Sequence, residues 1–172
     1  RDGSSTLLPE GIVALLVDIG SVGNLAGDRW LMKLAKKVLA SGRSKETIEE
    51  VKRDRPLNVS GVGKGSEMCS FNTHVPIAIP TDDCTLKAKL KVPTVPNSDL
   101  PGLLGLDSME NARSIIDTVS GKLYMVGPGE YDLGKLLPPG TATIQLLKAP
   151  SGHLMMPCDS FAAFDNEQKN GC

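Results

Sequence analysis

The chain has 172 residues and a mass of 18.2 kDa, a size typical of one domain or of one domain with an appendage. The 19 basic side chains oppose 20 acidic ones, and this balance excludes the strongly basic footprint of a general nucleic-acid binder. One Trp, two Tyr and three Phe are too few to favour base-stacking platforms. No apolar run is long enough to cross a bilayer, so we predict no transmembrane segment.

The positions of glycine and proline residues divide the chain into three parts. Residues 1–10 are predicted to form a polar N-terminal arm, residues 11–126 the main domain, and residues 127–172 a C-terminal extension with a hairpin and a tail. Because residue 1 is Arg, we expect a chain that is processed, truncated or cut from a longer polypeptide. The 18 Gly, the 12 Pro and the many β-branched residues favour short strands and a mainly β fold.

The first elements are predicted to be a strand and a helix. Residues 11–18 form a continuous apolar run that is typical of a buried strand. Residues 29–41 have helical periodicity, with Asn24 or Asp28 as the candidate cap. The highly charged residues 43–55 are expected to form a solvated loop or a short helix. The apolar face of the helix consists of Leu31, Leu34, Ala35 and Val38.

From residue 56 onward the pattern indicates strands. Residues 86–92 alternate apolar residues with lysine, which is the period of a half-buried strand. A short helix is expected from Asp107 or Ser108 through Arg113. Further strands are predicted at residues 57–59 and 75–79, as a hairpin over 114–126 with its turn at 120–121, and as two arms at 141–148 and 153–156 joined at 150–152.

Several familiar site motifs are absent from the sequence. The glycine-rich run at residues 61–66 lacks the Ser or Thr that must follow the lysine of a phosphate loop. His74 and His153 lie in separate segments, and surface or hydrogen-bonded histidines are the simpler interpretation. The cysteines at 69, 84, 158 and 172 form no C-x-x-C pair, so we expect free thiols, a reducing intracellular compartment, no metal and no cofactor.

One constellation combines a carboxylate with the end of a strand. Residues 15–21, Leu-Leu-Val-Asp-Ile-Gly-Ser, place Asp18 directly before a tight turn. Two carboxyl groups that meet at about 3 Å share one proton, because both cannot ionise. Such a pair activates a water with one oxygen and protonates a peptide carbonyl with another. The simpler interpretation is that Asp18 only caps its own turn.

This segment and two others, in order along the chain, resemble the retropepsin-like aspartic proteases. Leu16-Val17-Asp18-Ile19-Gly20-Ser21 is similar to their hydrophobic-Asp-Thr-Gly-Ser/Ala signature. Residues 59–63 resemble the glycine-rich flap, and residues 103–109 resemble the Leu-Leu-Gly segment before the C-terminal helix. The strand pair from residue 115 to residue 123 is similar to the pair that closes the fold. The nearest likeness is to the proteases of copia-type retrotransposon polyproteins.

The resemblance implies a closed barrel or sheet with one or two short helices. It implies an endopeptidase that hydrolyses a peptide or polyprotein with activated water. Only one Asp of this kind occurs in the chain, so the enzyme would be a homodimer. The implied site consists of Asp18, Gly20 and Ser21 in the catalytic loop, Gly61, Val62 and Gly63 in the substrate-binding flap, and Leu103, Leu104 and Gly105 as structural support.

Ile19 departs from the family pattern. It occupies the position of a Thr or Ser whose hydroxyl bonds across the family's dimer, and isoleucine has no hydroxyl. This leaves two other functions open: an inactive protease-derived subunit that contacts other proteins through residues 127–172, or a peptide- or ubiquitin-binding module. Each of the other two segments also has a purely structural interpretation. Residues 61–63 would then form an ordinary hairpin tip, and residues 103–106 would only be part of the core.

Overall fold

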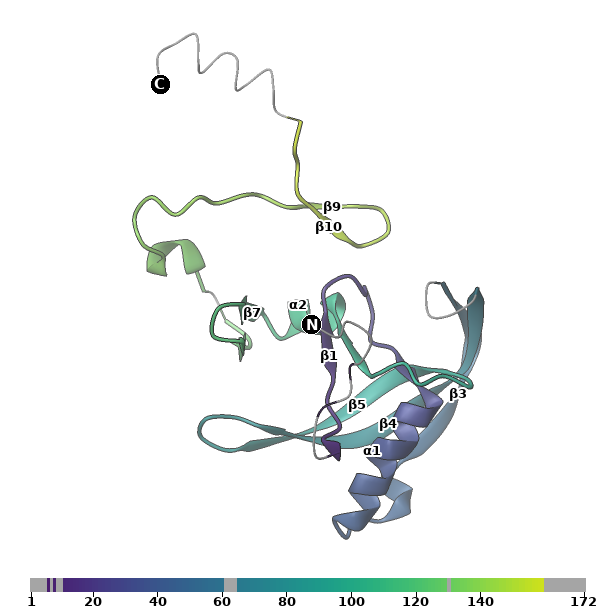
Figure 1. Cartoon of the computed structure of the whole chain (residues 1–172). Helices are drawn as coiled ribbons and strands as arrows, with labels where there is room; N and C mark the ends of the chain where they lie inside the picture. The colour runs from purple at the N-terminus through teal and green to yellow at the C-terminus, as the bar shows by residue number, and fades with distance from the viewer. Residues whose placement is uncertain (1–5, 7, 9–10, 61–64, 130, 160–172) are drawn as a thin grey trace, which may run out of the picture. The chain divides into compact units, whose positions relative to one another are not determined.

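The computed structural model describes residues 6, 8, 11–60, 65–129 and 131–159. The chain divides into two compact units (Figure 1). Unit 1 comprises residues 1–126 and contains the motifs of the predicted site. Unit 2 comprises residues 127–172, the Gly- and Pro-punctuated extension. Most of the N-terminal arm predicted at residues 1–10 lies outside the described residues.

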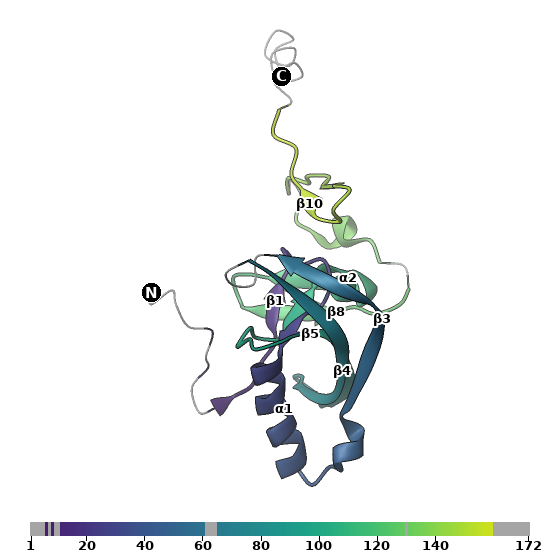
Figure 2. The ribbon, with the colours of Figure 1, turned by 90° about the vertical axis from the view of Figure 1, so that its right-hand side faces the viewer.

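A four-stranded sheet in the order β2–β5–β4–β3 forms the largest part of unit 1. Its three long strands are an antiparallel meander whose curvature is visible in Figure 2. The short strand β2 runs parallel to the end of β5. The bounds are β2 (Ala26–Gly27), β3 (Glu49–Ser60), β4 (Ser66–Pro80) and β5 (Thr85–Val95).

The prediction of a loop or short helix over residues 43–55 is wrong for its second half. A 3-10 turn, η2 (Lys45–Thr47), is followed at once by β3. Charged side chains conceal this strand in the sequence, because most of β3 is exposed and shows no apolar alternation. The register between β3 and β4 shifts between Lys52 and Leu57, where Pro56 has no N–H to donate to the ladder.

The helix α1 (Asp28–Ala40) packs on the sheet through the apolar face that the sequence predicts. Its N-cap is Gly27, and neither Asn24 nor Asp28 caps it. The Asp28 carboxylate instead accepts hydrogen bonds from the backbone N–H groups of Asn97 and Ser98, both at 2.9 Å. The buried cluster between helix and sheet includes Ala26, Trp30, Leu31, Val38, Val75, Leu90 and Val92.

The buried strand predicted at residues 11–18 is largely wrong. Only β1 (Leu16–Asp18) is a strand, and Leu16 and Val17 are each 42% exposed. β1 pairs on one edge with β6 (Leu103–Gly105), and within the described part of the chain these two strands make up the sheet. The apolar run therefore predicts a strand correctly at its end, but it does not predict that the strand is buried within the chain.

The remaining elements of unit 1 follow β6. α2 (Leu106–Asn111) begins after Gly105, so Asp107 and Ser108 lie inside the helix and do not cap it. β7 (Ser114–Asp117) and β8 (Lys122–Met125) form the predicted hairpin. The mainly β prediction is confirmed, with few short helices. Among the described residues the sheets are open, so the closed barrel is not formed.

Unit 2 contains little regular structure. The 3-10 turn η3 (Leu133–Leu136) precedes a hairpin of two-residue strands, β9 (Leu147–Lys148) and β10 (Leu154–Met155). The predicted arms at residues 141–148 and 153–156 are therefore much shorter than expected, although their turn lies where predicted. None of the residues described between 127 and 159 is buried.

Candidate active site

The loop that carries Asp18 is built on a pair of parallel strands. Leu16 is paired with Leu103, Val17 with Leu104 and Asp18 with Gly105. On the other side of β6, an antiparallel bridge joins Leu103 to Leu25. β6 thus lies between the strand that enters the loop and the segment that leaves it. Two sequence motifs far apart in the chain are brought together by this pairing.

Hydrogen bonds within the loop orient the Asp18 carboxyl. The side chain is half-buried, and the Gly20 N–H donates to its Oδ1 at 2.9 Å. The Ser21 N–H donates to the Asp18 carbonyl at 3.2 Å, and the Ser21 Oγ–H donates to the Gly23 carbonyl at 2.7 Å. In the described part of the chain, Oδ2 of Asp18 has no hydrogen-bond partner. One carboxyl oxygen is thus held by the backbone while the other remains available for a ligand.

The start of α2, which follows β6 in the Leu-Leu-Gly segment, is hydrogen-bonded to the Asp18 loop. The N–H groups of Leu106 and Asp107 donate to the carbonyls of Ser21 and Val22, both at 2.8 Å. These bonds satisfy two donors that every helix N-terminus leaves without an intrahelical partner. The loop and the helix therefore satisfy each other's backbone groups and fix their mutual position.

Asn24 and Gly105 complete the support. The Asn24 Oδ1 accepts the Gly105 N–H at 2.9 Å, a role that the sequence did not reveal because Asn24 stood out only as a helix-cap candidate. A Cβ on Gly105 would lie 2.3 Å from the Gly23 carbonyl oxygen, so only glycine fits. The predicted support residues Leu103, Leu104 and Gly105 all belong to β6.

Ile19 lies at an exposed position of the loop. Its side chain is 60% exposed, and the neighbouring Leu16 and Val17 of β1 are also exposed. Ile19 therefore adds to an apolar surface beside the Asp18 carboxyl. The structure gives it no polar partner, in accord with its side-chain chemistry.

The predicted flap residues Gly61, Val62 and Gly63 lie outside the described residues. The strands on either side are described up to the pair Ser60 and Ser66. Val59 of β3 packs on a buried cluster of Leu25, Cys69, Val95 and Leu103. The base of this hairpin therefore shares a core with the scaffold of the Asp18 loop.

The other reactive side chains lie apart from Asp18. His74 contacts Glu49, its Nδ1 3.4 Å from a carboxylate oxygen, and Lys89 donates to the same carboxylate at 2.8 Å. These two hydrogen bonds lower the pKa of Glu49. Burial raises the pKa of the Cys69 thiol and so keeps it protonated. His153 belongs to unit 2 and lies 2.9 Å from the Ser151 hydroxyl.

Across the described ranges, no group of three His, Cys, Asp or Glu side chains is arranged to hold a metal ion. None of the helices described there has the length and apolar character needed to span a membrane. Comparisons of the chain with protein-family models, with curated proteins and with solved structures found no match. Any assignment of function therefore rests on the motifs and geometry of the chain itself.

Proposed function

We propose that unit 1 is a retropepsin-like aspartic endopeptidase domain that works as a homodimer. The observation that carries the proposal is the Asp18 loop, in which one carboxyl oxygen is fixed by the Gly20 N–H and the other is available. Asp18 is the proposed acid and base. Gly20 and Ser21 shape its loop, and residues 61–63 are proposed to cover an extended peptide through backbone hydrogen bonds.

The chemistry requires two carboxyl groups and one water. One Asp18 is ionised and takes a proton from the water, whose oxygen attacks the peptide carbonyl carbon. The Asp18 of the partner subunit is protonated and donates its proton to the carbonyl oxygen. When the C–N bond of the resulting diol breaks, the Asp18 that took the water proton donates it to the nitrogen. The other Asp18 takes a proton from a diol hydroxyl, which leaves an amine and a carboxylic acid. A single chain supplies only one Asp18, so a second copy completes the site.

The exposed apolar surface around the loop supports pairing with a second copy. Leu16, Val17 and Ile19 all lie beside Asp18 with much of their side chains exposed. Covering such residues stabilises an association by roughly 25 cal/mol per Å² of apolar surface removed from water. A second copy that covers them with the same surface brings its own Asp18 to the same place, because a two-fold interface joins identical patches.

Mixing two forms of the chain tests this proposal. The full chain is expected to cleave apolar peptides at about pH 5, where a shared-proton pair is active, and to be inhibited by a statine. Asp18→Asn then replaces increasing fractions of the unchanged chain at a constant total chain concentration. Activity should fall with the square of the active fraction, because each mixed dimer lacks one carboxyl. A linear fall, or cleavage by a monomer, would contradict the shared site.

Ile19 favours a second candidate function, an inactive protease-derived domain in a larger assembly. Without a hydroxyl at this position, the cross-dimer hydrogen bond that the resemblance implies is absent. A catalytic group must be held to a fraction of an ångström, so a looser loop lowers activity steeply. Residues 127–172 are the proposed contact with other protein subunits, because large apolar side chains described between 131 and 156 are exposed.

Ile19→Thr separates the two candidates. If the unchanged chain is inactive and Ile19→Thr cleaves peptides, the natural chain is the inactive subunit. If both cleave, the enzyme assignment holds. Binding of extended peptides by both forms without cleavage by either favours the binding module instead.

A further inference from the structure

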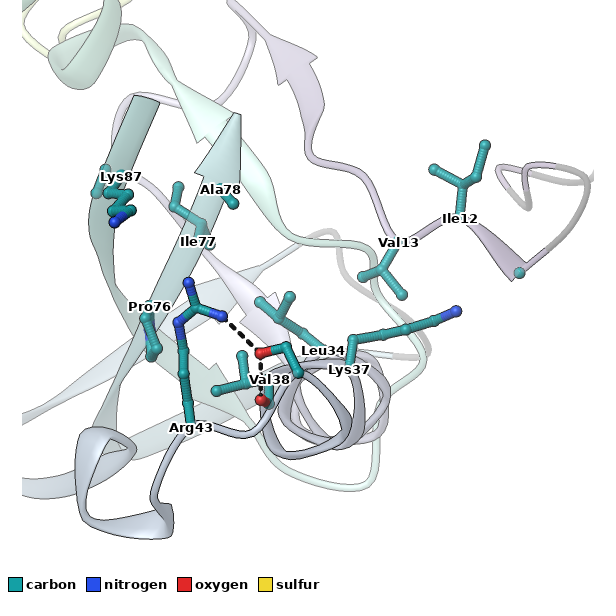
Figure 3. Close-up of a pocket in the computed structure, with 13 residues that line it drawn as sticks. Ile12, Val13, Leu34, Lys37, Val38, Arg43, Pro76, Ile77, Ala78 and Lys87 are labelled. Carbon is teal, nitrogen blue, oxygen red and sulfur yellow. Dashed lines mark hydrogen bonds between the residues drawn. The ribbon is translucent and has the colours of Figure 1, made fainter. Parts of the chain in front are cut away.

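A pocket of about 450 Å³ lies in unit 1 between the segment at residues 11–13, the C-terminal half of α1 and the strands β4 and β5 (Figure 3). Its volume is within the roughly 300–1,000 Å³ typical of small-molecule sites. Neither the Asp18 loop nor β6 contributes to its walls. It is therefore a feature separate from the candidate active site.

The interior of the pocket is apolar. Val13, Leu34, Val38 and Ile77 line it from three separate segments, and Figure 3 shows these side chains around one hollow. All four also pack on or belong to the core cluster beneath α1. The apolar side chains that line the pocket are thus part of a packed core, and their packing holds the pocket in shape without a ligand.

Among the described residues, the charged groups that line the pocket are all of one sign. They are Lys37, Arg43 and Lys87, with no described Asp or Glu beside them. The salt bridges between described residues use other cations and leave these three without a carboxylate. Such an arrangement attracts an anion.

Arg43 is held at the pocket by the end of the helix. The Ser41 Oγ–H donates to the Val38 carbonyl at 2.6 Å, and the Arg43 Nη1 donates to the same Ser41 oxygen at 2.6 Å (Figure 3). The Ser41 N–H also bonds the carbonyls of Lys37 and Val38. The carbonyls of Lys37 and Val38 are therefore satisfied by Ser41, and four guanidinium N–H groups of Arg43 remain for a ligand.

We propose that this pocket binds a small apolar carboxylate, such as a medium-chain fatty-acid anion. The hydrocarbon chain fills the hollow over Leu34 and Ile77, and the carboxylate accepts hydrogen bonds from Arg43, with Lys37 as a second cation. The apolar lining fits the hydrocarbon, and the three cations at the pocket fit the anionic head. The proposal is independent of peptide hydrolysis at Asp18.

Titration of the full chain with decanoate, below its micelle concentration, tests the proposal by calorimetry and by methyl NMR. The NMR shifts should centre on Val13, Leu34 and Ile77. Arg43→Gln should weaken binding about tenfold or more, because a charge-assisted hydrogen bond is lost. The matched control is Lys91→Gln, an exposed β5 cation outside the pocket, which should change affinity less than twofold.

Four further measurements separate the possible outcomes. Decanol, which lacks the charge, should bind much more weakly, and equal binding would overturn the anionic site. Ala88→Phe should fill the hollow and abolish binding while leaving the fluorescence of the buried Trp30 unchanged. A peptide with leucine and glutamate side chains that binds more tightly than decanoate would replace the small ligand with a protein partner. Shifts confined to unit 2 would overturn the site, and Asp18→Asn should bind decanoate normally.

Discussion

Unit 1 and unit 2 contain the same local turn in different surroundings. Asp18, Ile19 and Gly20 form it in unit 1, where the Gly20 N–H donates to Asp18 at 2.9 Å. In unit 2 the Gly134 N–H donates to Asp132 at 3.1 Å across Leu133. The Asp132 turn begins the 3-10 turn η3, whereas the Asp18 turn is hydrogen-bonded to the start of α2 and lies at the end of a parallel strand pair. The local turn alone therefore does not define a candidate site. The elements that hold the Asp18 turn in place distinguish it from the Asp132 turn.

Burial separates the two units in the same way. Unit 1 has fully buried core residues such as Val75 and Val92, whereas the described residues of unit 2 include none that are buried. The single tryptophan, Trp30, is 8% exposed in the core of unit 1, so its fluorescence reports the unfolding of that unit alone. Each variant below in unit 1 has a matched variant in unit 2.

The largest difference is expected for the two aspartates. Asp18→Asn should lower peptide cleavage by about 10²–10⁴-fold, the range for loss of a general acid or base. Asp132→Asn removes the same charge from the same kind of turn and should leave the rate unchanged. Cleavage rates at equal dimer concentration measure both. Equal losses would show that charge or folding, and not the Asp18 site, controls the activity.

Gly105→Ala should destabilise unit 1 by about 3 kcal/mol, because the new methyl group would overlap the Gly23 backbone. Gly134→Ala meets only the flexible end of the Asp132 side chain, at 3.3 Å, and should leave the unfolding of unit 1 unchanged. Denaturant unfolding followed by Trp30 fluorescence measures this. A Gly105 variant of normal stability would mean that β6 and the loop are not packed as described.

Val92→Ala should cost about 2 kcal/mol, because two methyl groups leave a fully buried site. Leu147→Ala removes a larger side chain, but one at a position that is 58% exposed in unit 2, and should change the stability of unit 1 by less than about 0.5 kcal/mol. The same unfolding experiment compares them. A large effect at Leu147 would reveal that another surface covers it.

The smallest effect concerns Asp28 and has a defined pH dependence. Burial raises the pKa of Asp28, but hydrogen bonds from the Asn97 and Ser98 N–H groups outweigh this and hold it below the ordinary value of 3.8. The stabilisation is therefore full above pH 3.8 and is lost as the pH falls through the lower, folded-state pKa.

Asp28→Asn should thus cost about 1 kcal/mol at neutral pH and progressively less in acid. Unfolding midpoints measured across the acid range test this, and Asp159→Asn in unit 2 is the control, since its side chain is exposed. A cost that stays constant with pH would show that the Asp28 charge does not contribute to the stability.

Patterns between near neighbours predicted much of the molecule. The helical period of Leu31 and Val38, the alternation in β5 and the turn at residues 120–121 each identified an element that the structure contains. The Asp18 turn is also local, since its donor lies two residues away. These elements depend on backbone preference and on side chains within one or two turns of chain.

Contacts between distant segments required the folded chain. The pairing of Asp18 with Gly105, the hydrogen bond from Gly105 to Asn24 and the pocket beneath Arg43 each join segments that no sequence period connects. The exposure of Leu16 is of the same kind, because the same apolar strand is buried or open depending on what lies beside it. Local patterns specify which segments become strands and helices, whereas burial and site geometry depend on which of those segments pack together.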